Sequence, residues 1–227
     1  MGAQGYPIFL KLRRAPVLIV GGGQVALRKA RGLTECDATI TIISPHFGGG
    51  FDDLPEIQRF VQLYTPGWLG RPELPRWKLV FAATSQEKIN QQVANDAQAA
   101  GILCCRCDEA ELGDFVSPAA VNQGPITLAV STHGASPALA ARVCHQLLER
   151  MDPVWPLQAQ LLAQWRVEMR NRVADAAVRR ELLERAAGVD MEQALRDGGT
   201  GAAQALLVRW IGARAGNGVR ENSGVGP

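Results

Sequence analysis

The chain has 227 residues, of which 47% are hydrophobic, with 24 Lys and Arg against 22 Asp and Glu. This composition is typical of a globular chain of one large or two modest domains. The charges are evenly distributed, since residues 1–150 carry 14 basic and 13 acidic groups. A global field that would attract nucleic acid or an anionic membrane is therefore excluded. Because no apolar run reaches the roughly 20 residues that span a bilayer and no signal segment is evident, we expect a cytoplasmic protein.

The cysteines predict reduced thiols. Their number is odd, and three of them cluster, which is a poor basis for a disulfide framework: Cys36, Cys104, Cys105, Cys107 and Cys144. The cluster lacks paired C-x-x-C spacing and lies in an apolar run that is typical of a strand. We interpret its members as small core residues and not as metal ligands.

Residues 1–113 alternate short apolar runs with helical patterns, which is typical of a parallel sheet covered by helices. The expected strands are residues 16–20, 38–43, 79–83 and 102–107, and the expected helices are 24–34 and 86–100. The Gly- and Pro-rich stretch 48–75 should hold a short helix or strand, and residues 61–64 are its best strand candidate. The predicted fold class is α/β, with a Rossmann-like parallel sheet domain.

Residues 114–150 form a second, small α+β segment, with an expected strand at 126–131 and a helix at 137–150. So short a segment cannot bury a core alone, so it should pack against the first domain or against another chain. Residues 151–215 are expected to form a C-terminal helical domain. Residues 216–227 form a polar, Gly-rich tail that we expect to be disordered.

An amphipathic helix is predicted within the helical domain, because apolar residues recur there at spacing four. They are Leu157, Leu161, Trp165, Met169 and Val173. We interpret this stripe as a packing surface and not as a cofactor site. Further along, Gly198, Gly199 and Thr200 should interrupt a helical pattern.

A nucleotide-binding pattern lies between the first strand and the first helix. Residues 21–26 read G-x-G-x-x-A, in which the first glycine permits a tight turn, the second lets the backbone approach a pyrophosphate, and Ala26 allows close helix packing. Amides at the helix N-terminus then bind the phosphates. Dinucleotide binding is favoured over a structural turn. The expected contacts are Gly21, Gly22, Gly23, Gln24 and Val25.

The second strand lacks the acidic residue that usually binds the ribose, because it is followed by Ser44, Pro45 and His46. Ser44, or backbone groups at Pro45 and His46, would then bind the ribose. No arginine follows this strand to hold a 2′-phosphate, which favours NAD over NADP. A second cofactor contact is expected at Ala83 and Thr84, although Thr84 or Ser85 could equally be an ordinary helix N-cap.

A series of further motifs resembles one family, the dehydrogenase and chelatase module of siroheme synthases. The matching stretches are residues 6–10, 20–29, 82–84 with Asn90, Asp108, 114–118 and 131–140. They span about residues 6–150, and the combination is much more specific than the glycine pattern alone. The resemblance implies NAD-dependent oxidation of precorrin-2 to sirohydrochlorin, in siroheme or cobalamin biosynthesis. Many family members also insert ferrous iron, which would be a substrate.

The resemblance also has consequences for assembly. It implies a homodimer in which the segment 114–150 is exchanged between subunits, with the helical domain helping to cover a tetrapyrrole cleft. A chain of 227 residues leaves no room for the methyltransferase domain of the longest siroheme synthases, so we expect precorrin-2 to come from a separate enzyme. Neither nucleic acid nor a membrane is expected as a partner.

Asp108 is the predicted catalytic residue. It ends a strand at the carboxyl edge of the sheet, where ligands of open α/β sheets bind, and it matches the aspartate to which the family assigns catalysis. A carboxylate there would act as a base or as a transient metal ligand. From the residues alone, Asp108 could equally cap the chain before Glu109. Asp114 is interpreted as a turn residue.

By resemblance, a loop of small residues borders the tetrapyrrole. The expected substrate contacts are Ser131, Thr132, His133, Gly134, Ser136 and Arg106, with Arg28 and Arg142 as further candidates for its carboxylates. Ser136 is also placed to cap the helix that begins near Pro137.

Two features depart from the family pattern. His133 stands where the family usually has glycine, and Cys105 and Arg106 replace an Asn-Val pair. His133 would be either a metal ligand or proton carrier, or an ordinary surface residue.

The alternative is a non-catalytic module that senses NAD(H). It leaves the motifs between residues 114 and 140 unexplained.

Overall fold

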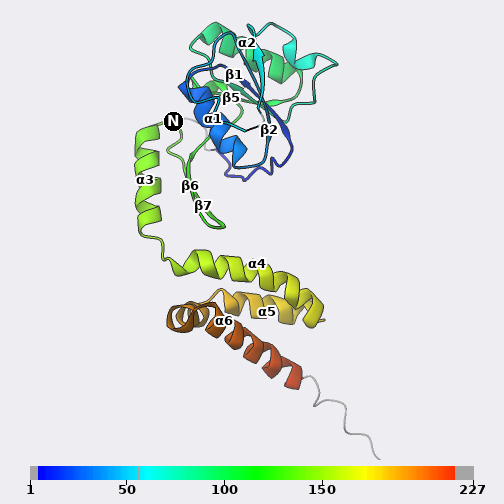
Figure 1. The fold of residues 1–227 in the computed structure, drawn as a ribbon, viewed down its shortest axis with the longest axis vertical. Helices are drawn as coiled ribbons and strands as arrows, with labels where there is room; N and C mark the ends of the chain where they lie inside the picture. The colour runs from blue at the N-terminus through cyan, green and yellow to red at the C-terminus, as the bar shows by residue number, and fades with distance from the viewer. Residues whose placement is uncertain (1–4, 56, 218–227) are drawn as a thin grey trace, which may run out of the picture. The chain divides into compact units, whose positions relative to one another are not determined.

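The computed structural model describes residues 5–55 and 57–217, and the chain forms two compact units (Figure 1). The first unit extends to Pro118 and includes Ser131–Ser136; the second comprises Ala119–Val130 and the chain from Pro137 onward. The predicted tail, residues 216–227, lies outside the described residues except for the last two residues of the final helix.

The first unit is built on a parallel sheet of five strands in the order β3-β2-β1-β4-β5. The strands are β1 (Pro16–Val20), β2 (Thr39–Ser44), β3 (Gln58–Val61), β4 (Leu79–Ala82) and β5 (Leu103–Arg106). The strand order reverses between β1 and β4, which is the arrangement of a Rossmann-type domain. The predicted fold class is confirmed.

Two hydrophobic layers cover the sheet, one on each face. The helix α1 (Gln24–Thr34) packs on the face that carries the odd-numbered residues of β1, and α2 (Glu87–Ala99) packs on the other face. Adjacent strand residues point to opposite faces, so Cys105 is buried in the first layer and Cys104 in the second. Their interpretation as core residues is confirmed.

The segment between β2 and β4 differs from the prediction. The strand is β3, at residues 58–61, and the expected strand at 61–64 is wrong. β3 is an edge strand with no fully buried residue, so its sequence pattern is weak. Tyr64 is buried for another reason: it lies beside Trp68 of the short 3₁₀ helix η1 (Trp68–Gly70). Its hydroxyl donates to Asp96 at 2.7 Å.

The second unit begins with an antiparallel hairpin. Its strands are β6 (Ala119–Gln123) and β7 (Ile126–Val130), and the helix α3 (Pro137–Glu149) runs alongside both (Figure 1). The predicted strand and helix are confirmed at β7 and α3. The strand β6 (AAVNQ) is not predicted, because it has a single β-branched residue, whereas β7 (ITLAV) has three.

Three helices complete the second unit: α4 (Val154–Arg172), α5 (Ala176–Ala186) and α6 (Val189–Asn217). Trp165 and Met169 of the predicted stripe are buried among them, whereas Leu157 is 45% exposed. The next residue, Gln158, is buried instead, and its amide donates to the carbonyl of Ala186 at 3.0 Å. A kink interrupts α6 at Gly198 and Gly199, as expected. No helix within residues 5–55 and 57–217 is long and apolar enough to cross a membrane.

Candidate active site

The loops that carry the predicted site leave the sheet at one edge. Val20 at the end of β1 is paired with Ile43 of β2 and with Ala82 of β4, and Ala82 is paired with Arg106 of β5. The four strands therefore end side by side. In open parallel sheets this edge, next to the point where the strand order reverses, is where ligands bind.

The three glycines after β1 have different surroundings. Gly21 has a φ of +130°, and a Cβ atom there would lie 2.3 Å from the carbonyl oxygen of Ala83. A Cβ at Gly22 would lie 2.0 Å from the carbonyl oxygen of His46. At Gly23, by contrast, a Cβ would meet open space. The first two glycines are therefore required for packing the loops together, and the third leaves its backbone accessible to a ligand.

The N-terminus of α1 is suited to an anion. Gly23 is its N-cap, and no side chain among the described residues caps the helix there. The first turn contains no acidic residue. The first amides of a helix have no partner within the helix, and the helix dipole adds attraction for negative charge. The backbone at Gly23, Gln24 and Val25 thus offers donors for a phosphate group.

The loop after β2 holds itself against the glycine loop. Ser44 is buried, and its hydroxyl donates to the carbonyl of His46 at 2.6 Å. The amide of Gly48 donates to the carbonyl of Gly22 at 2.8 Å. Ser44 would have to give up this bond to donate to a ribose, whereas Pro45 and His46 are exposed.

Asn90 fixes the loop after β4. Its side chain is fully buried, accepts from the backbone amide of Thr84 at 3.0 Å and donates to the carbonyl of Thr84 at 3.0 Å. The Thr84 hydroxyl donates to Asn90 Oδ1 at 2.7 Å. The N-cap of α2 is Gln86, so the alternative in which Thr84 or Ser85 is an N-cap is wrong. These bonds fix the backbone of Thr84 at the edge of the sheet where β4 ends.

Asp108 follows β5 and is held by a bidentate ion pair. Arg106 donates through Nε to Oδ1 and through Nη2 to Oδ2, both at 2.8 Å. These bonds from Arg106 hold the pKa of Asp108 well below its usual range, although burial opposes the shift, and a bond from Asn90 adds to it. The carboxylate side chain keeps 27% of its surface exposed. Asp108 is thus an oriented anion with one side open to a ligand.

Arg106 faces the interior and not the solvent. Its side chain is completely buried, and its remaining terminal nitrogen, Nη1, donates to Gln91 Oε1 at 2.7 Å. Contact with a substrate, as predicted from the sequence, would require these bonds to break. The geometry instead makes Arg106 a positioning residue for Asp108. The sequence offers no signal for Gln91, which is one of several polar residues on α2, but Asn90 was visible as part of a motif.

Asp114 has a structural contact. Its carboxylate accepts from the backbone amide of Cys104 at 2.8 Å, and its own amide donates to the carbonyl of Cys104 at 2.8 Å. These bonds tie the segment after the 3₁₀ helix η2 (Ala110–Leu112) back to β5. The interpretation of Asp114 as a turn residue agrees with this geometry.

The loop Ser131–Ser136 belongs to the same compact unit as the sheet. The Thr132 hydroxyl accepts from the amide of Ser136 at 3.0 Å, and the amide of His133 donates to Ser131 Oγ at 3.1 Å. His133 has a φ of +51°, in the left-handed region that favours glycine. This conformation accounts for the glycine that the family pattern has there. His133 is exposed.

Two thiols precede Asp108, Cys105 on β5 and Cys107 directly after it. A hydrogen bond from Cys107 lowers the pKa of Cys105 to about 7, and the same bond raises the pKa of Cys107. Within residues 5–55 and 57–217, no group of three His, Cys, Asp or Glu side chains is arranged to hold a metal ion.

Known proteins match the chain over nearly its whole length. A family model described as putative NAD(P)-binding matches residues 8–119, and one described as sirohaem biosynthesis protein central matches residues 123–143. The siroheme synthase of Chromobacterium violaceum is 34% identical over 208 residues, which are 92% of this chain and 44% of that protein. The siroheme synthase of Gluconacetobacter diazotrophicus is 36% identical over 174 residues, 75% of this chain and 36% of that protein.

The chain belongs to the siroheme synthase family. The resemblance inferred from the motifs is thereby confirmed, and the chain spans less than half the length of these siroheme synthases. A solved structure titled SirC, precorrin-2 dehydrogenase has the same fold, with a TM-score of 0.72 at 22% identity, and the match covers 92% of this chain and 100% of that one. The first family model includes the glycine loop and Asp108, and the second includes the loop at His133.

Proposed function

We propose that this member of the siroheme synthase family oxidises precorrin-2 to sirohydrochlorin with NAD as the hydride acceptor. The observation that carries the proposal is an oriented, ionised carboxylate, Asp108, at the sheet edge that also carries a loop suited to a dinucleotide. Family membership and the fold shared with a precorrin-2 dehydrogenase support a tetrapyrrole as the substrate class.

The residues at the sheet edge fit NAD. The open backbone at Gly23 and the uncapped first turn of α1 would hold the pyrophosphate, because a side chain there would fill the space that the phosphates need. The exposed backbone at Pro45 and His46 would hold the ribose, and Ala83 and Thr84 would lie along the cofactor. When bound, NAD supplies the acceptor for the hydride that the oxidation releases.

The low pKa of Asp108 suits this oxidation. The reaction removes a hydride and a proton from the macrocycle, and loss of the hydride leaves a cation whose remaining protons are acidic. An oriented carboxylate stabilises the developing positive charge and then accepts a proton even though it is a weak base. The pair formed with Arg106 fixes both oxygens, so one conformation of the carboxylate faces the open side.

The test is anaerobic incubation of the protein with precorrin-2 and NAD. We expect NADH and sirohydrochlorin to form in equal amounts, and Asp108→Asn to lower kcat by about 100-fold or more, the scale of a lost acid–base group. The Kd for NAD should stay within about threefold, since the glycine loop is unchanged. The matched control is Asp114→Asn, which changes a carboxylate that is hydrogen-bonded to the backbone of β5 outside the proposed chemistry.

Several outcomes would contradict the proposal. Folded protein that binds NAD but forms no NADH with precorrin-2 would refute the oxidation, and wild-type turnover by Asp108→Asn would refute the role of Asp108. Binding of NADH without any tetrapyrrole binding would instead indicate an NAD(H)-sensing module.

Iron insertion, the homodimer and tetrapyrrole contacts at Ser131–Ser136 are proposals that rest on the resemblance. A cytoplasmic location is a proposal that rests on the sequence, in which no apolar run reaches the roughly 20 residues that span a bilayer. For iron, Fe²⁺ is added to sirohydrochlorin, and the free-base spectrum of sirohydrochlorin should disappear faster with the protein than without it. For assembly, sedimentation velocity should give a dimer mass. An unchanged metallation rate or a monomer mass would refute the respective proposal.

A further inference from the structure

A cavity of about 550 Å³ lies between α4 and α5 in the second unit, and none of the residues that line it belongs to the candidate active site. Its volume is within the range of small-molecule sites. It is lined by Leu162, Arg166, Arg170, Ala176, Arg179, Arg180, Leu183, Glu184 and Ala187. The lining therefore combines apolar side chains with four arginines and a single glutamate.

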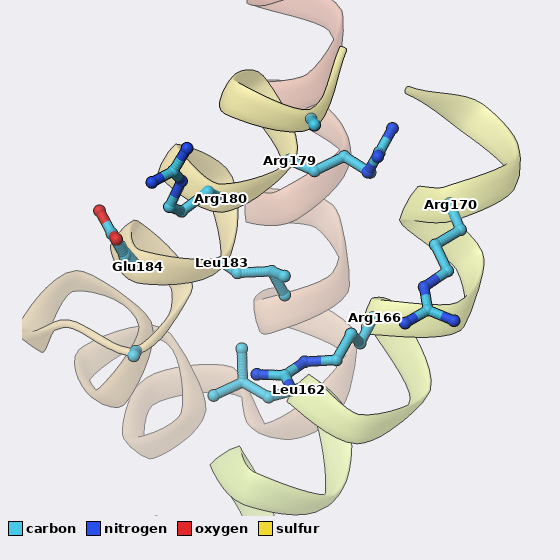
Figure 2. Close-up of a pocket in the computed structure, with 9 residues that line it drawn as sticks. Leu162, Arg166, Arg170, Arg179, Arg180, Leu183 and Glu184 are labelled. Carbon is cyan, nitrogen blue, oxygen red and sulfur yellow. The ribbon is translucent and has the colours of Figure 1, made fainter. Parts of the chain in front are cut away.

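The side chains come from both helices. Figure 2 shows Arg166 extending from α4 toward α5, and Arg179 extending from α5 toward α4. Leu162 and Leu183 lie between these two helices (Figure 2). Arg179 is anchored, since its Nη1 donates to the carbonyl of Val173 at 2.7 Å and to that of Ala174 at 2.6 Å. One of the four guanidinium groups thus has a structural role.

The other three arginines are available to a ligand. Arg166, Arg170 and Arg180 make no ion pair or hydrogen bond with any side chain of the described residues. Arg166 and Arg170 are four residues apart on α4, so their like charges are neighbours and disfavour the helix. Exposed cations elsewhere on the same helix do find partners, as Arg172 does with Glu168 at 3.0 Å. An external anion bound in the cavity would offset the repulsion between Arg166 and Arg170.

We propose that this cavity binds an organic polycarboxylate with an apolar body. The leucines and alanines would contact the apolar part, and the guanidinium groups of Arg166, Arg170 and Arg180 would bind carboxylates, for which their planar donors are well suited. The tetrapyrroles of the proposed function belong to this chemical class, so the identity of the natural ligand rests on that function. The existence of the site rests on the cavity and its unpaired arginines alone.

The experiment uses uroporphyrin as the probe and the full chain as the protein, with binding followed by porphyrin fluorescence. The test variant is Arg166→Gln/Arg170→Gln. The matched control is Arg150→Gln/Arg209→Gln, which removes the same charge from exposed positions of the same unit outside the cavity. We expect the test variant to raise the Kd about tenfold or more, the loss of roughly one charge-assisted contact, while the control stays within about twofold.

Two further arms identify the ligand chemistry. Coproporphyrin, which has half as many carboxylates, should bind more weakly to the wild type and should be less affected by the test variant. Raising the salt concentration should weaken uroporphyrin binding to the wild type more than to the test variant, because fewer ionic contacts are screened in the latter. Circular dichroism verifies that both double variants are folded.

The inference is overturned if the test and control variants bind uroporphyrin equally, as they would if the probe bound only at the catalytic edge. It is also overturned if oligoglutamate, and not the porphyrin, binds in an Arg166- and Arg170-dependent way, because the occupant would then be an acidic protein segment. Turnover separates this result from the proposed function. If the protein does not oxidise precorrin-2 but binds porphyrin in an Arg166- and Arg170-dependent way, only the proposed function is refuted. If it oxidises precorrin-2 normally but its porphyrin binding does not depend on these arginines, only the cavity site is refuted.

Discussion

Arg106 in the first unit and the cavity arginines Arg166 and Arg170 in the second have opposite surroundings. In the first unit Arg106 is completely buried, and its guanidinium is bound by Asp108 and Gln91. In the second unit Arg166 and Arg170 are exposed at a cavity and have no ion-pair partner among the described residues. The internal partner fixes the orientation of the Asp108 carboxylate, whereas the charges of Arg166 and Arg170 have no partner among the described residues. Burial and pairing thus distinguish an arginine that orients another side chain from arginines whose charge the described residues leave unpaired.

The largest effect is expected at Gly22 of the first unit, where a side chain has no room. A Cβ there would lie 2.0 Å from the carbonyl oxygen of His46, and backbone atoms cannot move aside cheaply. Gly22→Ala should therefore lower the free energy of unfolding by about 4 kcal/mol or more, the range of severe overpacking and strain. Urea denaturation measures the loss, and NAD binding should disappear with the loop geometry.

Gly23 provides the matched control for Gly22. A Cβ there meets open space, so Gly23→Ala should cost about 1 kcal/mol or less as a change at an N-cap. If NAD lies on this backbone, the added methyl group should still weaken NAD binding in calorimetry. Unchanged NAD affinity in Gly23→Ala would contradict the assignment of the pyrophosphate, and equal destabilisation by both variants would contradict the difference between the two glycines.

Arg106→Met tests the buried side of the comparison. It leaves Asp108 without its bidentate partner and Gln91 Oε1 without a donor, and it should lower the free energy of unfolding by about 3 kcal/mol. Arg106→Lys should restore part of this loss, since the charge returns without the fork of donors. The acid limb of the kcat/KM profile should move to higher pH in Arg106→Met, a shift that a purely structural role would not produce.

The pH dependence of stability sharpens the same point. The folded-state pKa of Asp108 is lowered by Arg106, so the pair stabilises the fold above the unfolded pKa of about 3.9 and loses this contribution as the pH falls toward the folded pKa. The stability difference between wild type and Arg106→Met should therefore shrink by about 1 to 2 kcal/mol between pH 5 and roughly pH 2. A difference that is constant across this range would show that Arg106 acts through packing alone.

Much of the first unit could be predicted from the sequence because its elements are specified locally. The run Pro16–Val20 followed by the glycine loop marks β1 and α1, since buried parallel strands are continuously apolar. The edge strand β3 (QRFV) lies three residues before its predicted position and the hairpin strand β6 (AAVNQ) is not predicted, because each contains at most two β-branched or aromatic residues. At these positions, pairing with a neighbouring strand decides the structure more than the pattern does.

The candidate active site likewise has features that the sequence predicts and features that it does not. Asp108 and the glycine loop carry motifs, but the partner of Asp108 could not be read from the chain, and Arg106 was assigned outward when it faces inward. The cavity in the second unit was invisible for a related reason: its arginines come from two helices, and only tertiary packing brings Arg166 and Arg179 together. Spacing within one helix shows Arg166 and Arg170 as neighbours, but it cannot show what lies opposite them.

The smallest expected effect has the opposite sign and tests the exposed side of the comparison. Arg170→Gln removes a charge that repels Arg166 one turn away, so it should raise the free energy of unfolding by about 0.3 kcal/mol at low salt, and the gain should fade as salt screens the repulsion. Arg209→Gln, at an exposed position outside the cavity, should leave stability unchanged within error. Loss of stability in Arg170→Gln would mean that the protein itself satisfies this arginine. The contrast with Arg106 would then fail, because an arginine kept for a ligand should stabilise the fold only when that ligand is bound.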